Sequence, residues 1–408
     1  MRSPKIIAQI ILSSIFEIII SLIVIGVMVG CGKIRTPLPP ELFRESEVQG
    51  MTGVRTYAFE HNLEFGADLI ASVKQELRFS LTAHDDASGH FNILALSGGG
   101  SNGAFGAGIL NGWSATGTRP IFKIVTGIST GALIAPFAFL GEDYDQVLKQ
   151  VYTSVETKDI MKLNSYLISE QGLDSLADSS PLRKLIKKYV TEKVIRSVAL
   201  AHQQGRRLYI GTTDLDVGRL VIWNMGAIAS YDNPEADNLF RKILLASASI
   251  PILLPPVYIP VEAGGEIYEE MHVDGGVSTE VFLYGDILNL DDIARSVGLS
   301  SVGPGRIYII QNLKSLPQYV PVKSNLVAIS KRTVTSFLAN QGNGDLYRIY
   351  SIAKREGIEF KLVFIPFTYE SHDPLNFDPV SMERLFDLGY RMASSGDPWQ
   401  NHPPGYEE

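Results

Sequence analysis

The chain of 408 residues is short of cysteine and of positive charge. It has one cysteine, Cys31, so no disulfide can form within the chain, and a disulfide-stabilised secreted fold is excluded. Lys and Arg total 36 against 44 Asp and Glu, which gives a net charge of -8. That balance argues against nucleic acid as a partner. The sequence also shows no basic stripe that would bind anionic lipid headgroups, so we expect any contact with a lipid surface to rely on apolar loops and an anchor.

Long apolar runs are likewise missing, except at the amino terminus. There a stretch over residues 6–29 follows Arg2 and Lys5 and is interrupted by Glu17. The uninterrupted run, residues 18–30, fits the core of a signal peptide and is short for a complete membrane span. We therefore expect residues 1–30 to be a signal peptide, with an uncleaved membrane anchor as the alternative.

The end of this leader suggests how the protein is attached to a membrane. It reads Met28-Val29-Gly30-Cys31, which resembles a bacterial lipobox. Lipidation of Cys31 would explain both the position and the isolation of the only cysteine. The expectation is a lipoprotein of the bacterial cell envelope, anchored to a membrane through its lipidated amino terminus, on the periplasmic side of the outer membrane.

A glycine-rich turn follows the first apolar run of the main body. Residues 91–97 predict a buried parallel strand, and the small residues from Gly103 onward predict a helix packed close to a sheet. A glycine loop that opens a helix leaves several backbone N–H groups unpaired, at the positive end of the helix dipole. Such a loop holds an anion, either a phosphate or the oxyanion of a tetrahedral intermediate. The loop consists of Gly98, Gly99, Gly100, Ser101, Asn102 and Gly103.

A G-x-S-x-G pentapeptide lies about thirty residues further on, from Gly127 to Gly131. It follows a predicted strand over residues 121–126 and precedes an apolar helix that starts at Thr130 and contains Pro136. Strand, pentapeptide and helix are the context of a nucleophile elbow, in which the small residues let the backbone turn sharply and leave the Ser129 hydroxyl clear.

A dinucleotide site is the main alternative for the glycine loop, because Gly98, Gly100 and Gly103 fit G-x-G-x-x-G. That site also needs an acidic residue about twenty positions further on, to hold a ribose. The chain has Lys123 and then the serine pentapeptide near that distance, with no Asp or Glu. The elbow interpretation is therefore favoured.

A serine nucleophile needs a base, and the segment Met271-His272-Val273-Asp274-Gly275-Gly276 offers two candidates. His272 and Asp274 lie on the same side of a strand. A carboxylate within reach of a serine can take its proton if burial raises its basicity. Asp-Gly is also common turn chemistry, so Asp274 as a plain turn cap remains an alternative from these residues alone.

Four blocks in order give the chain a family resemblance. These are G-G-G-x-x-G at 98–103, G-x-S-x-G at 127–131, the run from Ala246 to Pro256, and D-G-G at Asp274, Gly275 and Gly276. The chain resembles the patatin-like phospholipases, a group of lipid acyl hydrolases that use a Ser-Asp dyad. The resemblance implies Ser129 as nucleophile, Asp274 as base and the glycine loop as oxyanion hole. It also implies a lipid or ester substrate and no metal or organic cofactor. The family often has Arg or Lys where this chain has Asn102, which leaves more of the anion binding to backbone N–H groups.

Alternating strands and helices imply an α/β fold with three layers, α/β/α, around a mostly parallel central sheet. The main additional elements are strands at 207–214, 219–223, 305–311 and 357–366, and helices at 63–81, 145–154, 181–190, 344–355 and 379–394. Residues 156–180 are polar and irregular and predict an ordinary insertion, with a flap near the site as the alternative. Asp214 and Asp216 predict a capped turn. We divide the chain into the signal peptide, a lipidated cysteine and tether (31–62), an N-terminal helix and loop (63–90), the catalytic domain (91–315), a C-terminal extension of the same domain (316–397) and an unstructured tail (398–408).

The sequence therefore predicts a serine acyl hydrolase that cleaves carboxylic ester bonds of lipids. Two alternatives stay open: a Ser-His-Asp esterase using His272 or another histidine, and a lipoprotein that binds lipid without catalysis. The apolar segment 250–257 either lines an acyl-chain groove or forms a buried turn. The sequence leaves the oligomeric state and the headgroup of the substrate open.

Overall fold

The computed structural model describes residues 35–58, 63–83, 91–163, 175–283, 290–300, 304–314, 319, 321–370 and 373–406. The signal-peptide prediction and Cys31 lie outside these ranges. Within them, no helix is both long and apolar enough to cross a membrane.

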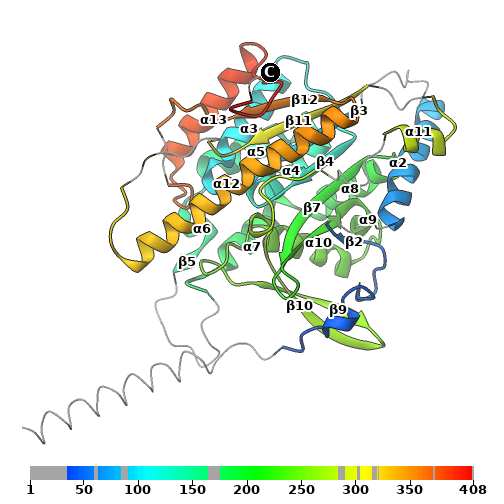
Figure 1. Cartoon of the computed structure of the whole chain (residues 1–408), viewed down its shortest axis with the longest axis horizontal. Helices are drawn as coiled ribbons and strands as arrows, with labels where there is room; N and C mark the ends of the chain where they lie inside the picture. Colours follow the sequence, from blue (N-terminus) through cyan, green and yellow to red (C-terminus); the bar gives the residue numbers. More distant parts are fainter. Residues whose placement is uncertain are drawn as a thin grey trace, which may run out of the picture.

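One large mixed sheet runs through the molecule (Figure 1). Its main path is β1-β9-β10-β7-β4-β3-β11-β12, and β8 pairs with β7 and β2 beside it. The five consecutive strands from β7 to β12 along this path are parallel, whereas the strands around β10 and β8 pair antiparallel. The strands are β1 (Glu47–Val48), β2 (Arg55–Tyr57), β3 (Phe91–Leu96), β4 (Ile124–Gly127), β7 (Arg207–Asp214), β8 (Arg219–Asn224), β9 (Val257–Ala263), β10 (Glu266–Asp274), β11 (Gly305–Gln311) and β12 (Glu359–Phe364).

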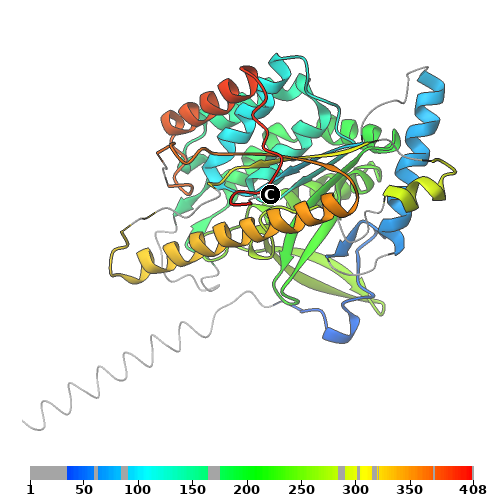
Figure 2. The same ribbon diagram turned by 45° about the horizontal axis from the view of Figure 1, so that its top comes forward.

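Helices cover both faces of this sheet because successive strand residues point to opposite sides and both sides are apolar. In β3, Leu94 and Leu96 belong to one core cluster, and Ile93 and Ala95 belong to the other. Figure 2 shows α13 and α12 on opposite sides of the sheet. One side carries α3 (Gly103–Ala115), α4 (Thr130–Leu140), α5 (Asp145–Ser154), α8 (Glu192–Gln203), α10 (Pro234–Ser247) and α13 (Pro379–Ser394); the other carries α2 (Leu63–Ala83), α11 (Leu290–Ser296) and α12 (Leu326–Arg355). The predicted three-layer α/β fold is thereby confirmed.

The remaining elements are short, and several lie in the segment that the sequence suggested was irregular. They are α6 (Thr157–Ile160), β5 (Lys162–Leu163), β6 (Ala177–Asp178), α7 (Ser180–Tyr189) and α9 (Met225–Ala229). The strands β5 and β6 form a separate antiparallel pair. The predicted insertion is therefore partly ordered beside α7.

The sheet topology places two distant parts of the chain at one edge. Strand β7 extends beyond its neighbour β4, whose last residue Gly127 lies opposite Ile210. The extra length of β7 pairs antiparallel with β10, and Asp274 lies opposite Thr212. The carboxyl ends of β4 and β10 therefore meet at the same end of β7.

Two predictions about the chain ends were wrong. The expected tether is part of the body from residue 35 onward, because β1 pairs with β9, β2 pairs with β8, and Arg55 forms a buried ion pair with Glu270. The tail is also ordered. Gln400 exchanges two backbone hydrogen bonds with Leu362 of β12, and Trp399 packs against Trp113. The contact between Trp399 and Trp113 orders the tail, although the sequence predicted an unstructured segment there.

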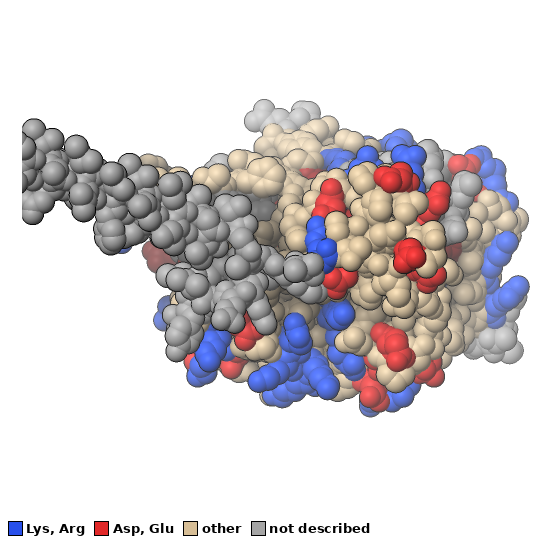
Figure 3. All heavy atoms as spheres, turned by 90° about the horizontal axis from the view of Figure 1, so that it is seen from below, with Lys and Arg blue, Asp and Glu red and all other residues tan. Residues whose placement is uncertain are grey.

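The structure gathers basic side chains on one short helix. Helix α7 exposes Arg183, Lys184, Lys187 and Lys188 along one face. Figure 3, which views the molecule from below, shows a group of Lys and Arg side chains near the lower edge of the picture. The overall negative charge hid this local excess, because net charge says nothing about where charges lie on a fold.

Candidate active site

Ser129 occupies a sharp turn between β4 and α4. Its backbone lies at φ 53° and ψ -122°, a combination that non-glycine residues rarely adopt. The neighbouring glycines allow it, because a Cβ at Gly127 would stand 2.6 Å from the carbonyl oxygen of Gly131 and a Cβ at Gly131 would overlap the carbonyl oxygen of Leu96. The Ser129 N–H donates to the hydroxyl of Ser247 at 3.0 Å, which fixes the turn from the side. The predicted elbow geometry is therefore present.

Asp274 lies directly beside this serine. The Ser129 hydroxyl donates to Asp274 Oδ2 at 2.6 Å, and the N–H of Gly276 donates to Oδ1 at 2.8 Å. A Cβ at Gly275 would stand 2.6 Å from the carbonyl oxygen of Gly211, so this turn needs its glycine. The carboxylate is thus oriented on both oxygens, with one of them aimed at the serine.

The surroundings of Asp274 make it more basic than an ordinary aspartate. Burial raises the pKa of Asp274 from 3.8 to about 7, against the opposing effect of the hydrogen bonds from Ser129 and Gly276. A carboxylate that titrates near neutral pH is suited to accept a proton and to return it. The pair can therefore activate a hydroxyl without a histidine.

The glycine loop presents fewer free N–H groups than its six residues suggest. Four of its N–H groups already donate within the fold: Gly98 to Glu280, Ser101 to Pro374, Asn102 to Gly99, and Gly103 to Gly100. In the part of the chain that the structure describes, the N–H groups of Gly99, Gly100 and Thr130 have no acceptor. Gly100 and Thr130 line the same pocket as Ser129. Of the six predicted loop residues, Gly99 and Gly100 thus keep an N–H group available for an oxyanion, and Thr130 adds one from outside the loop.

The backbone of the loop needs its glycines. Gly99 and Gly100 lie at φ 145° and 58°. A Cβ at Gly99 would stand 2.5 Å from the carbonyl oxygen of Asn312, and one at Gly100 would overlap the carbonyl oxygen of Pro374. The chain therefore passes between two other backbone segments, and its shape depends on residues that are remote in sequence.

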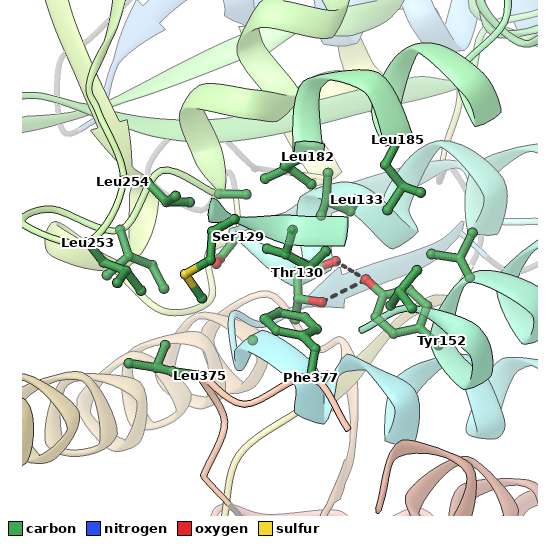
Figure 4. A pocket seen from close by; sticks show the side chains of 17 residues that line it. Ser129, Thr130, Leu133, Tyr152, Leu182, Leu185, Leu253, Leu254, Leu375 and Phe377 are labelled. Carbon is green, nitrogen blue, oxygen red and sulfur yellow. Dashed lines mark hydrogen bonds between the residues drawn. The ribbon is translucent and has the colours of Figure 1, made fainter. Parts of the chain in front are cut away.

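An apolar pocket lies against Ser129 (Figure 4). Its lining is almost entirely hydrocarbon and comes mainly from α4, α5, α6, α7 and the segments 248–254 and 375–377. Residues of the predicted acyl-groove segment are among the lining residues: Ile250, Leu253 and Leu254. The polar exceptions are Ser129, Thr130 and Tyr152, and the Tyr152 hydroxyl is bonded to the hydroxyl of Thr130 at 2.7 Å and donates to its carbonyl at 3.1 Å. The arrangement suits a hydrocarbon chain whose ester lies at the serine.

Sequence analysis missed Glu280, which lies close to the pair. The side chain is 3% exposed, and its Oε2 has no hydrogen-bond partner among the described residues. That oxygen stands 2.5 Å from where a Cβ on Gly98 would be. Burial, and then the charges of Asp274 and Asp345, raise the pKa of Glu280 well above its usual range. The carboxyl group of Glu280 therefore packs directly against the glycine loop at Gly98. Its place four residues after Gly276, just before the apolar Val281 and Phe282, was the available signal.

His272, the alternative base, is engaged elsewhere. Its Nδ1 lies 2.9 Å from the hydroxyl of Thr212, and its Nε2 lies 3.1 Å from Glu270. The three histidines in the described ranges make no hydrogen bond to Ser129 or Asp274. The hypothesis of His272 as the base is therefore wrong, because both of its ring nitrogens belong to a buried network around Arg55.

The turn carrying Asp214 and Asp216 is a capped turn, as predicted, since Asp214 accepts the N–H of Asp216 at 3.0 Å. Across the described ranges, no group of three or more His, Cys, Asp or Glu is arranged to hold a metal ion.

Comparison with known proteins gives one family match. Residues 94–283 match the family model Patatin, described as patatin-like phospholipase. No curated protein matches the chain. Among solved structures, VipD from Legionella pneumophila is 12% identical, with 75% of this chain and 66% of that one covered and a TM-score of 0.37. The human GIVD cytosolic phospholipase A2 is 10% identical, with 86% and 65% covered and a TM-score of 0.35. The chain thus spans just under two thirds of the length of either protein.

Proposed function

We propose that the chain is a serine hydrolase that cleaves carboxylic ester bonds of lipids with a Ser129–Asp274 dyad, because residues 94–283 match the family model of the patatin-like phospholipases. The observation that carries the proposal is the 2.6 Å hydrogen bond from the Ser129 hydroxyl to a buried carboxylate at the wall of an apolar pocket. The family match supports lipid acyl hydrolysis, and this geometry supports the dyad.

The proposed reaction has two steps. Asp274 takes the proton of Ser129 as the serine oxygen attacks the ester carbonyl carbon, and the carbonyl oxygen becomes an oxyanion. The N–H groups of Gly99, Gly100 and Thr130 are the candidates to stabilise that oxyanion. The protonated Asp274 then returns its proton to the departing alcohol, which leaves an acyl group on Ser129. Asp274 next takes a proton from water, and the resulting hydroxide attacks the acyl carbon. Asp274 then gives that proton to the departing Ser129 oxygen, which releases the fatty acid and restores the serine.

The pocket supports an ester with a long hydrocarbon acyl chain as the substrate. Its lining has no charged residue, so the headgroup and glycerol of the lipid would stay outside it. A lipid substrate also agrees with the proposed attachment of the amino terminus through a lipidated Cys31. Incorporation of labelled fatty acid into the wild type and its loss in Cys31→Ser would test that attachment.

Fluorophosphonate labelling tests the dyad most directly. We expect the wild type to be labelled once, Ser129→Ala to take no label, and Asp274→Asn to be labelled much more slowly. Ser154→Ala serves as the matched control, since Ser154 is an exposed serine on α5. A folded wild type that takes no label would refute the hydrolase proposal and favour the alternative of a lipoprotein that binds lipid without cleaving it.

A further inference from the structure

Helix α7 has two faces with different chemistry. Leu182 and Leu185 on one face line the apolar pocket next to Ser129. The opposite face exposes Arg183, Lys184, Lys187 and Lys188, which follow the spacing of a single helix surface. One helix therefore forms a wall of the proposed acyl pocket and, outside it, a positively charged surface.

The positive charges of this surface are largely uncompensated. In the described part of the chain, none of the four forms an ion pair, although the Lys188 ammonium lies 4.8 Å from the centre of the Tyr189 ring. Lys162 of β5 adds an exposed cation and lies opposite Asp178 in the β5–β6 pair. Asp178 accepts both the N–H and the hydroxyl of Ser180, so it caps α7. Five exposed cations thus gather on α7 and β5 in a chain that is negative overall.

An apolar rim adjoins this basic face. Leu163, Leu176 and Ile252 are 71%, 45% and 64% exposed. They are neighbours in space, because the N–H of Leu176 donates to the carbonyl of Ile252 at 2.8 Å and Leu163 lies opposite Ala177 in the β5–β6 pair. Single exposed apolar residues are ordinary, but a cluster next to the wall of an apolar pocket indicates an interaction surface.

Ile252 adds an independent observation. It lies at φ 71°, which is a strained conformation for a β-branched residue, and its side chain gains little from packing. Its neighbours Ile250, Leu253 and Leu254 point into the pocket lining. The backbone therefore holds an exposed isoleucine outward at the border of the pocket, at a cost to folding.

We propose that α7 and the β5–β6 pair form the surface by which the protein binds an anionic phospholipid bilayer. The α7 cations lie against the headgroups, and Leu163, Leu176 and Ile252 enter the boundary with the acyl chains. Juxtaposed basic and apolar residues match the two layers of a lipid surface, since cations attract anionic headgroups and apolar side chains gain from burial beneath them. An acidic protein would satisfy the lysines but would leave the rim and the adjacent pocket without a matching partner. The inference rests on the proposed function for the use of this surface, which brings a lipid ester to the pocket.

Vesicle binding tests the surface independently of catalysis. All variants carry Ser129→Ala, to prevent hydrolysis, and Cys31→Ser, to prevent lipidation. The partition coefficient is measured for two kinds of vesicle. One contains phosphatidylcholine alone, and in the other phosphatidylglycerol makes up about one third of the lipid. Because every variant carries the same leader, a difference between variants in the ratio of the two coefficients reports the contribution of the replaced side chains to the preference for anionic lipid.

The charge variant is Lys184→Gln, Lys187→Gln and Lys188→Gln together. Each cation near an anionic surface changes binding about fivefold, so the preference is expected to fall roughly 100-fold. The matched control is Lys74→Gln, Arg384→Gln and Arg391→Gln, which removes the same charge from exposed positions on α2 and α13. Its preference should equal that of the parent. A preference that survives in the α7 variant, or falls equally in the control, overturns the proposal and leaves an acidic protein as the partner of α7.

A fluorophore reports the orientation. With Cys31 replaced, an added cysteine is the only one in the chain, so Leu163→Cys and, as control, Arg384→Cys can each be labelled with an environment-sensitive dye. The dye at 163 should shift to the blue when anionic vesicles are added, and the dye at 384 should not. A dye at 163 that stays in water while the protein is bound overturns the proposal.

The enzyme with Ser129 intact separates this inference from the proposed function. Hydrolysis of a water-soluble short ester should be equal in the parent and the α7 charge variant, whereas hydrolysis of lipid in anionic vesicles should fall in the variant. If the parent cleaves no ester, the proposed function fails, and the vesicle experiments still decide whether the surface binds lipid.

Discussion

Replacing Asp274 with Asn should stabilise the protein while it abolishes catalysis, and the stabilisation should grow with pH. Asn can keep both hydrogen bonds of the native carboxylate, since its oxygen can accept from Gly276 and its amide can donate to Ser129. What it removes is the cost of holding a negative charge in a buried site.

The size of the effect follows from the pKa of Asp274, which burial raises from 3.8 to about 7. Below pH 3.8 the carboxyl is protonated in the folded and the unfolded state, so its charge costs nothing. Between pH 3.8 and about 7, Asp274 is ionised in the unfolded state but protonated in the folded state, so folding requires uptake of a proton. Above pH 7 the cost is complete, at about 1.4 kcal/mol for each of roughly three units, or about 4 kcal/mol. At pH 5 it is about 2 kcal/mol.

Urea unfolding of the wild type and of Asp274→Asn at pH 5 and pH 8 measures this change. The free-energy advantage of the variant should be about 2 kcal/mol larger at pH 8. Asp387→Asn is the matched control, because Asp387 is exposed on α13 and its replacement should have the same effect at both pH values. An advantage of Asp274→Asn that is independent of pH would refute the argument that burial of this carboxylate limits stability.

Three further results are expected. The kcat/KM for a soluble ester should fall about tenfold per unit below pH 7 and level off above it, because only ionised Asp274 accepts the serine proton; a flat profile would count against the dyad. Tyr152→Phe removes both hydrogen bonds to Thr130 at the start of α4, so kcat should fall roughly five- to tenfold with KM little changed; steady-state kinetics that match the wild type would contradict a positioning role. Gly131→Ala places a Cβ against backbone carbonyl oxygens at the end of β3 and should lower the free energy of unfolding by about 2 kcal/mol or more, whereas Gly396→Ala, with open space around it, should not; equal thermal unfolding of the two would contradict the close packing of the elbow.

Much of the central fold could be predicted from the sequence because its signals are local. The strands at 207–214 and 305–311 and the helix at 379–394 have the bounds that apolar runs and proline placement predicted. Strands β1 and β2 could not be predicted in this way. Arg55 is buried because Glu270, which lies 215 positions away, neutralises it, and nothing near Arg55 in the sequence indicates that partner.

The residues of the candidate site also differ in whether local sequence could predict them. Residue type and spacing pointed to Ser129 and Asp274, and the structure brings the two side chains together because β4 and β10 pair with the same edge of β7. Which loop N–H groups remain free could not be predicted, because Pro374 and Glu280 accept two of them from remote segments. The position of Glu280 beneath the loop depends on the same tertiary packing.

The tail that crosses β12 has a consequence for solubility. Strand β12 is the last strand of its sheet, and an open edge offers unpaired N–H and C=O groups to the strands of other molecules. Gln400 occupies that edge at Leu362, and Trp399 fastens it to Trp113 and Tyr308. The last residues of the chain thus protect the edge of β12 from pairing with other molecules. A chain shortened before Trp399 would keep its dyad and leave this strand edge unpaired, so we expect it to self-associate before it loses activity.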